Sequence, residues 1–215
     1  KQDGYFPFGS ENAKGSSIKD LKEFYHIYPW GRYPQQLSDN TWKLYRRLCQ
    51  IAEELLDWVE LNTPVEIAES FSMALSEMVQ DSPRNLLRII HYPSLSGDEE
   101  KGAVRAAPHE DINLLTILVA GTEPGLQVQD VNGNWHDVSC DPGTLAINTG
   151  DMLQMASGGF YPSTTHQVIN PISSQKNSAR FSMPLFLHPI DGVRLNKNYT
   201  AGSYLEERLK EIGLK

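Results

Sequence analysis

The sequence predicts a mainly β protein with flanking α-helices. Apolar residues recur at helical spacing before residue 85, and short apolar or alternating runs separated by turn residues follow it. Many short strands at such spacing are typical of a sandwich, a jelly roll or a barrel. The chain has 215 residues, 40% of them hydrophobic, and is therefore long enough for one globular domain with a sizeable core.

The first 37 residues are rich in Gly, Pro, Tyr and Ser, and we predict an irregular segment there. Four aromatic residues of this segment are expected to pack against the domain, with lining of a pocket as the alternative. They are Tyr25, Tyr28, Trp30 and Tyr33. Because the chain begins at Lys1 rather than at a methionine, we expect that an N-terminal portion is missing.

Two helices are predicted before the strands and one after them. The first follows from apolar residues at helical spacing: Leu44, Leu48, Ile51, Leu55, Leu56 and Val59. The second would begin at a capping box over 63–66, with Pro64 at the first helical position, and would bury Ile67, Phe71, Leu75 and Met78. Another capping box, over 203–206, predicts a last helix that ends near Gly213.

The strand region is predicted from runs of apolar and β-branched residues. These runs are 86–92, 114–119, 126–131, 144–147, 152–155, 165–169 and 181–187. Asn132-Gly133 predicts a two-residue hairpin, whose two central positions both need positive φ. The chain thus divides into an irregular segment and helical flank (1–84), a β core (85–190) and a C-terminal helix (191–215).

Composition argues against several classes of protein. The formal net charge is −8 and no run supplies a basic footprint, so no nucleic-acid partner is expected. No apolar run approaches the roughly 18 residues that a membrane-spanning helix needs. Cys49 and Cys140 lie far apart without a CxxC spacing, which argues against a disulfide framework or a zinc knuckle. A reducing compartment, and hence a cytoplasmic location, is expected.

Three residues predict a metal site. His109 and Asp111 are two positions apart, and on an extended strand such side chains point to the same face. A further ligand is expected from His166, in a later strand-like run. Two histidines and one carboxylate on one side of a metal leave adjacent coordination positions open, which suits Fe(II) that binds a chelating cosubstrate and O2.

A later strand carries Arg180-Phe181-Ser182, in which the guanidinium and the hydroxyl again share a face. Arginine can bind a carboxylate through two parallel hydrogen bonds, and serine can donate another. This pair suits the far end of a dicarboxylate cosubstrate.

The order His-x-Asp, His, Arg-x-Ser resembles the iron(II)/2-oxoglutarate-dependent dioxygenases related to isopenicillin N synthase. The resemblance covers roughly residues 85–190 and includes the surrounding motifs. These are Pro108-His109-Glu110-Asp111, Gly125-Leu126-Gln127-Val128, Asn134-Trp135, Asn148-Thr149-Gly150-Asp151-Met152-Leu153-Gln154 and Ser163-Thr164-Thr165-His166.

This resemblance implies a single dioxygenase domain with a double-stranded β-helix (jelly-roll) core, and a family N-terminal region that is largely missing. It implies His109, Asp111 and His166 as catalytic iron ligands, and Arg180, Ser182 and Tyr92 as 2-oxoglutarate contacts. Ile90 stands where the family's Asn-x-Tyr motif has asparagine, and Gln167 where plant members often have arginine.

The expected function is oxidation, by default hydroxylation, of a C–H bond in a small-molecule substrate. The reaction would use Fe(II), O2 and 2-oxoglutarate, which becomes succinate and CO2, with ascorbate as a candidate reductant. Desaturation and cyclisation stay open as outcomes. The alternatives are a related iron oxidase that does not use 2-oxoglutarate, a jelly-roll metalloenzyme for isomerisation or hydrolysis, and a non-catalytic metal-binding jelly-roll domain.

Overall fold

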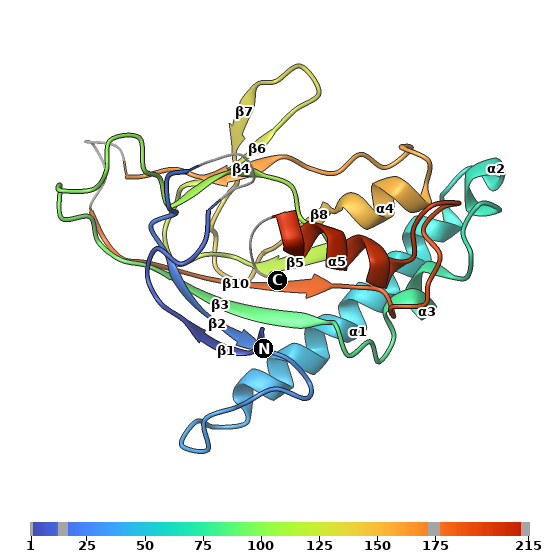
Figure 1. Ribbon diagram of the computed structural model, residues 1–215, viewed down its shortest axis with the longest axis horizontal. Coiled ribbons are helices and arrows are strands. Elements are labelled where there is room, and N and C mark those ends of the chain that lie inside the picture. Colours follow the sequence, from blue (N-terminus) through green and yellow to red (C-terminus); the bar gives the residue numbers. More distant parts are fainter. Residues whose placement is uncertain (1, 13–16, 172–176, 212–215) are drawn as a thin grey trace.

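Two antiparallel sheets face each other in the computed structural model, which describes residues 2–12, 17–171 and 177–211 (Figure 1). The six-stranded sheet has the order β1 (Gly4–Phe6), β2 (Glu23–Ile27), β3 (Leu86–Tyr92), β10 (Arg180–Leu187), β5 (Leu115–Val119) and β8 (Leu145–Thr149). The four-stranded sheet has the order β4 (Ala106–His109), β9 (His166–Val168), β6 (Leu126–Gln129) and β7 (Trp135–Asp137). The predicted jelly-roll core is confirmed.

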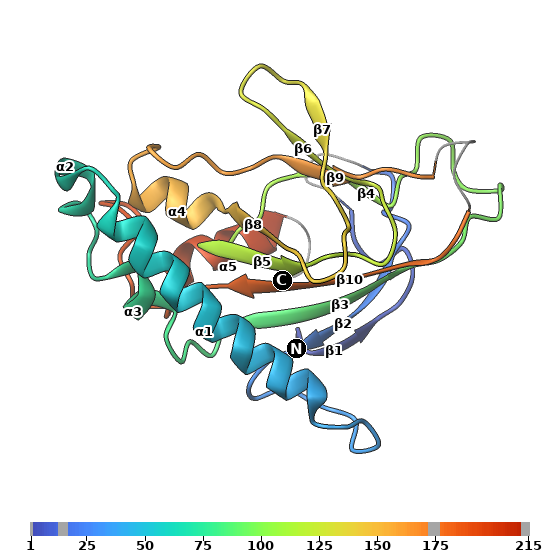
Figure 2. The same cartoon turned by 180° about the vertical axis from the view of Figure 1, so that it is seen from behind.

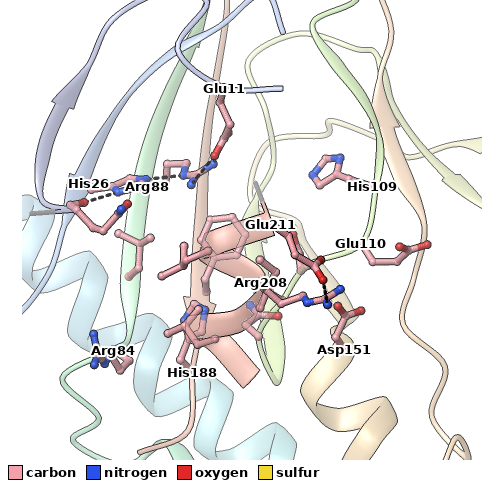
Figure 3. A pocket seen from close by; sticks show the side chains of 18 of the residues that line it. Glu11, His26, Arg84, Arg88, His109, Glu110, Asp151, His188, Arg208 and Glu211 are labelled. Atoms are coloured by element: carbon pink, nitrogen blue, oxygen red, sulfur yellow. Dashed lines mark hydrogen bonds and ion pairs between the residues drawn. The ribbon is translucent and has the colours of Figure 1, made fainter. Parts of the chain in front are cut away.

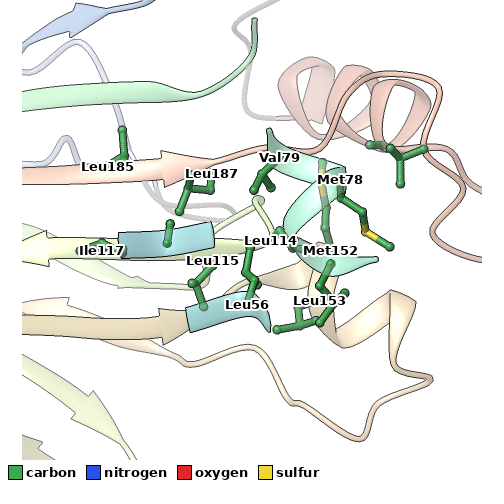
Figure 4. Packing of buried hydrophobic residues seen from close by; sticks show 14 of the residues in the cluster. Leu56, Met78, Val79, Leu114, Leu115, Ile117, Met152, Leu153, Leu185 and Leu187 are labelled. Atoms are coloured by element: carbon green, nitrogen blue, oxygen red, sulfur yellow. The ribbon is translucent and has the colours of Figure 1, made fainter. Parts of the chain in front are cut away.

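The main hydrophobic core lies on the outer face of the large sheet. The helix α1 (Asn40–Leu61) crosses this face and buries Tyr45, Leu48, Ala52 and Leu56 (Figure 2). Figure 4 shows Leu56 packed among leucines of β5 and β10 and residues of the short helices α3 (Leu75–Val79) and α4 (Asp151–Ala156). Because side chains alternate along a strand, the other face of β3 and β10 is turned toward the small sheet, where the predicted site residues lie.

Six of the seven predicted strands are present as β3, β5, β6, β8, β9 and β10, with bounds that differ by at most two residues. The strand predicted at 152–155 is wrong, because this stretch belongs to α4. Its buried residues Met152, Leu153 and Ala156 fall on one side of a helical turn. A run of four residues is too short for periodicity to separate a strand from a helix.

The irregular segment predicted at 1–37 is also partly wrong, since it contains β1 and β2. These strands are short, and β2 is held by pairing with β3, from Glu23 opposite His91 to Ile27 opposite Leu87. Such long-range pairing leaves little trace in the local sequence. Tyr25 and Tyr33 pack against the core as expected, whereas Tyr28 and Trp30 line a cavity.

The second predicted helix is two short helices, α2 (Val65–Ala68) and α3. Thr63 does not cap α2, because its hydroxyl donates to the Val59 carbonyl instead. A carboxylate oxygen of Glu60 accepts the backbone N–H of Leu75 at the start of α3.

The last helix, α5 (Ala201–Glu211), begins before the predicted capping box. The Thr200 hydroxyl accepts the backbone N–H of Ser203, and the Ser203 hydroxyl accepts that of Thr200. The predicted end near Gly213 lies outside the described residues. No helix among the described residues is long and apolar enough to cross a membrane.

The predicted hairpin at Asn132-Gly133 joins β6 and β7, but its turn is longer than two residues. Only Gly133 has positive φ (84°), and its N–H donates to the Asp130 carbonyl. The Asp130 carboxylate accepts the backbone N–H groups of Asn132 and Asn134, which stabilises the wider loop.

Candidate metal and cosubstrate site

The structure brings the three predicted metal ligands together. His109 ends β4 and His166 begins β9, and the two residues are directly paired between these strands. Their ring centroids are 4.4 Å apart, and Nε2 of His166 lies 3.7 Å from Oδ1 of Asp111. The atoms that the three side chains offer all lie within 4.8 Å of one another, so they can bind one ion.

Both histidines are oriented by backbone carbonyls. Nδ1 of His109 donates to the carbonyl of Ala107 at 2.8 Å, and Nδ1 of His166 donates to that of Thr164 at 2.9 Å. Since a carbonyl only accepts, the proton is on Nδ1 and the lone pair of each Nε2 faces the site. Burial, followed by the charge of His166, lowers the pKa of His109 to about 4, so the imidazole is neutral and able to ligate.

One carboxylate oxygen of Asp111 is held by the protein, and the other faces His166. Oδ2 accepts hydrogen bonds from the Thr116 hydroxyl at 2.6 Å and from the Asn148 amide at 2.9 Å. Thr116 and Asn148 are register partners on β5 and β8. Burial would raise the pKa of Asp111, but the two imidazoles and these hydrogen bonds outweigh it and lower that pKa.

The loop after Asp111 is fixed by the start of α4. The backbone N–H of Asp151 donates to the Asp111 carbonyl at 2.8 Å, and that of Met152 donates to the Asn113 carbonyl at 3.0 Å. A Cβ at Gly150 would lie 2.3 Å from the Asn113 carbonyl oxygen, so this position requires glycine for the close approach. The carbonyls of Asp111 and Asn113 thus accept hydrogen bonds from the first N–H groups of α4, which have no acceptor within the helix.

Arg180, Ser182 and Tyr92 also lie together, on the face of β10 and β3 that is turned toward the small sheet. Arg180 is opposite Tyr92 in the register, and its guanidinium carbon is 5.3 Å from the centre of that ring. Arg180 is 1% exposed, and its Nε donates to the Glu123 carbonyl. Its Nη1 is buried and has no hydrogen-bond partner in the described part of the chain. A buried unpaired guanidinium N–H is unfavourable, and a bound carboxylate would satisfy it.

Ile90, which replaces the family's asparagine, lies opposite Ser182 and is buried. The side chain at this position is therefore apolar, whereas an asparagine here would offer polar groups.

A cavity of about 800 Å³ adjoins the metal ligands (Figure 3). His109 and Asp111 lie on its wall, together with residues from β2, β3, β10 and α5. The sequence prediction missed these other residues, among them His26, Arg88, Phe186, His188 and Leu205. Phe186 and His188 continue the i, i+2 series of Arg180 and Ser182, which is the signal that could have identified them.

His188 is the most unusual residue of this wall. It is 9% exposed, and its Nδ1 has no hydrogen-bond partner among the described residues. Burial lowers the pKa of His188 to about 4, so the ring is neutral near pH 7. A neutral imidazole can donate one hydrogen bond and accept another, which suits an uncharged polar group of a ligand.

The cations of the wall are already paired. Nη1 of Arg88 lies 3.1 Å from the Glu11 carboxylate, and Lys22 lies 2.9 Å from both Glu11 and Asp20. Nε of Arg88 donates to Nε2 of His26, whose Nδ1 donates to the carbonyl of Gln2. Arg84 and Arg208 are paired with Asp191 and Glu207.

A jelly-roll core in which two histidines and an aspartate converge is the arrangement of mononuclear non-haem metal proteins. Residues 83–189 match the model of the 2OG-Fe(II) oxygenase superfamily. A 2-oxoglutarate-Fe(II) type oxidoreductase of Aspergillus fumigatus is 32% identical over 208 residues, which are 85% of this chain and 58% of that protein.

Two solved structures agree in fold and sequence. A candidate oxygenase from Shewanella oneidensis is 52% identical with a TM-score of 0.86, over 100% of this chain and 77% of that one. A candidate 2OG-Fe(II) oxygenase family protein from Caulobacter crescentus is 31% identical with a TM-score of 0.70, over 98% and 76%. The chain belongs to the 2OG-Fe(II) oxygenase superfamily, so the family resemblance is confirmed. It spans less than two thirds of the length of the curated relatives it matches.

Proposed function

We propose that this protein is an Fe(II)- and 2-oxoglutarate-dependent oxygenase that couples decarboxylation of 2-oxoglutarate to hydroxylation of a C–H bond in a small molecule. His109, Asp111 and His166 hold the iron, which when bound supplies the activation of O2. The observation that carries the proposal is the His-Asp-His cluster combined with the buried, partly unpaired Arg180 between the same two sheets.

Arg180, Ser182 and Tyr92 are proposed to bind the distal carboxylate of 2-oxoglutarate. The free Nη1 of Arg180 and the buried hydroxyl of Ser182 are donors on one strand face, and the Tyr92 ring lies beside the guanidinium. Such a carboxylate-binding pocket has no role in an oxidase that works without 2-oxoglutarate. It therefore favours the 2-oxoglutarate-dependent reaction over that alternative.

The substrate is proposed to be a small, uncharged polar molecule. Each described cation of the cavity wall has an acidic partner, so an anionic substrate would have to displace an existing ion pair. His188 and Phe186 offer a neutral hydrogen-bonding group and an aromatic surface. The unpaired cysteines, Cys49 and Cys140, support a reducing, cytoplasmic location as part of the proposal.

The test is succinate formation by protein loaded with iron under anaerobic conditions and then given 2-oxoglutarate and O2. We expect succinate from the wild type and none above background from His166→Ala. His136→Ala is the matched control, because His136 lies exposed on the β6–β7 hairpin, and it should keep the wild-type rate. Absence of both succinate and 2-oxoglutarate binding in iron-replete wild type would favour the non-catalytic metal-binding alternative.

A further inference from the structure

Two arginines are among the largest fully buried side chains of the protein. Arg105 and Arg180 are each 1% exposed. Within the described part of the chain, neither forms an ion pair with a carboxylate, and each has a buried guanidinium nitrogen without a hydrogen-bond partner. These atoms are Nε of Arg105 and Nη1 of Arg180. Buried charges are normally paired, so two buried guanidinium groups without a carboxylate partner among the described residues indicate that an anion binds here.

Arg105 lies at the same end of the sheets as Arg180. It immediately precedes β4, and its Nη2 donates to the carbonyl of Ser178, two residues before Arg180. The next residue, Ala106, packs in the same small cluster as Tyr92, the register partner of Arg180. The backbone N–H of Arg105 donates to the side chain of Asn170, which fixes the start of β4.

The two guanidinium groups are close enough to influence each other. Burial, followed by the positive charge of Arg180, lowers the pKa of Arg105, while Tyr92 and Glu123 act in the opposite direction. Burial also lowers the pKa of Arg180. Two like charges in a water-poor site repel each other, and an anion bound beside both would offset this repulsion.

We propose that Arg105 is a second cationic residue of the 2-oxoglutarate pocket, acting with Arg180 on the distal carboxylate. The inference rests on the proposed function and extends it, because it assigns a role to a residue outside the Arg-x-Ser motif. The second charge makes the pocket selective for 2-oxo acids that carry a distal carboxylate. If Arg105 only donated a hydrogen bond to the Ser178 carbonyl, it would not contribute to this selectivity.

The test compares 2-oxoglutarate with 2-oxopentanoate, which has the same chain length and no distal carboxylate. Binding of both is measured by calorimetry on Mn(II)-loaded protein, so no turnover is needed. In Arg105→Gln we expect affinity for 2-oxoglutarate to fall about tenfold or more, and affinity for 2-oxopentanoate to change less than about twofold. Arg105→Lys, which keeps the charge, should lose less than Arg105→Gln.

Arg194→Gln, at an exposed arginine, is the control and should bind both acids as the wild type does. Thermal unfolding of the ligand-free variants shows whether each is folded. If Arg105→Gln is not folded, the two affinities of Arg105→Lys are compared with those of the wild type instead. Equal loss of affinity for both acids, or no loss for either, would overturn the inference and leave the proposed function intact. Wild-type protein that binds neither acid would overturn both.

Discussion

The two carboxylate oxygens of Asp111 have different surroundings. One oxygen accepts two hydrogen bonds from Thr116 and Asn148, which leaves the other for an ion. The histidines follow the same rule, since each Nδ1 donates to a carbonyl and each Nε2 faces the other two ligands. Ligands held in this way lose little conformational freedom when the metal binds.

Replacing Thr116 by valine keeps the shape of the side chain and removes one hydrogen bond to Asp111. We expect the affinity for Fe(II) or Mn(II) to fall about 10- to 100-fold, because ligand orientation depends on such contacts. Competition with a chelator measures this. Thr144→Val is the control, because Thr144 is exposed and its hydroxyl donates to the Asp141 carbonyl within the same turn. An unchanged metal affinity in Thr116→Val would contradict the role given to this hydroxyl.

Gly121 controls the position of Arg180. A Cβ there would lie 2.5 Å from Nη2 and 2.8 Å from Cζ of Arg180. In Gly121→Ala the guanidinium must therefore move, and we expect about tenfold weaker binding of 2-oxoglutarate. Titration of metal-loaded protein with 2-oxoglutarate measures this, with Gly192→Ala as control because a Cβ at Gly192 meets nothing within 4 Å. Wild-type affinity in Gly121→Ala would show that Arg180 does not contact the cosubstrate.

The loop that carries Asp111 and Asn113 is held in place by the junction of β8 and α4. Asn148 at the end of β8 binds the carboxylate of Asp111, and the first N–H groups of α4 bind the carbonyls of Asp111 and Asn113. Gly150 lies between these two contacts and allows the backbones to approach. One strand end and one helix start thus hold the same loop.

Gly150→Ala should damage both the fold and the metal site. The new Cβ would lie within 2.3 Å of the Asn113 carbonyl oxygen and 2.8 Å of the Asp111 carbonyl oxygen, and backbone atoms cannot yield as a flexible side chain does. We expect the free energy of unfolding in urea to fall by about 1–3 kcal/mol or more. Metal affinity should fall as well. A variant as stable as Gly192→Ala would show that the loop adapts easily.

Across the chain as a whole, a buried charge network joins the N-terminal segment to the sheets. Glu11 is paired with Lys22 and Arg88, and Lys22 is also paired with Asp20. The Asp20 carboxylate accepts the backbone N–H of Ala107 in β4. Residues far apart in sequence therefore form one wall beside the metal ligands (Figure 3).

This network gives stability a defined pH dependence. Burial would raise the pKa of Glu11, but Arg88 and Lys22 lower it below its ordinary value of 4.5. A carboxyl group with a lowered pKa stabilises the fold above its unfolded pKa, and this contribution is lost as the pH falls. Burial would lower the pKa of Lys22, but Glu11 and Asp20 raise it above 10.5, so its contribution is present below that pH and lost above it.

Glu11→Gln should therefore lower the free energy of unfolding near pH 7, by about 3–5 kcal/mol, because it leaves Arg88 and Lys22 with one acidic partner fewer. The variant should also lose part of the decline below pH 4.5 that the wild type shows. Urea unfolding from pH 3 to 8 measures both effects. Glu66→Gln, on a short surface helix, is the control. Parallel pH profiles of Glu11→Gln and wild type would contradict the assigned ion pairs.

The sequence alone determined the β core, the positions of six of its strands along the chain and the grouping of His109, Asp111 and His166. It could do so because strand alternation decides which side chains share a face, because Fe(II) sites use histidine and carboxylate ligands, and because the order of the motifs resembles a known dioxygenase family. The same logic found Arg180 and Ser182. It failed for 152–155, where four residues fit a strand and a helix equally well.

Tertiary structure alone placed β2 beside β3 and β1 beside β2, and brought Glu11, His26 and His188 to one cavity. It also bound the Arg105 guanidinium to the carbonyl of Ser178, two residues before Arg180. Glu11, His26, His188 and Arg105 stand in no motif, and their neighbours come from distant parts of the chain. The local sequence pattern indicates the face on which a side chain lies. The identity of its neighbours depends on long-range strand pairing and packing.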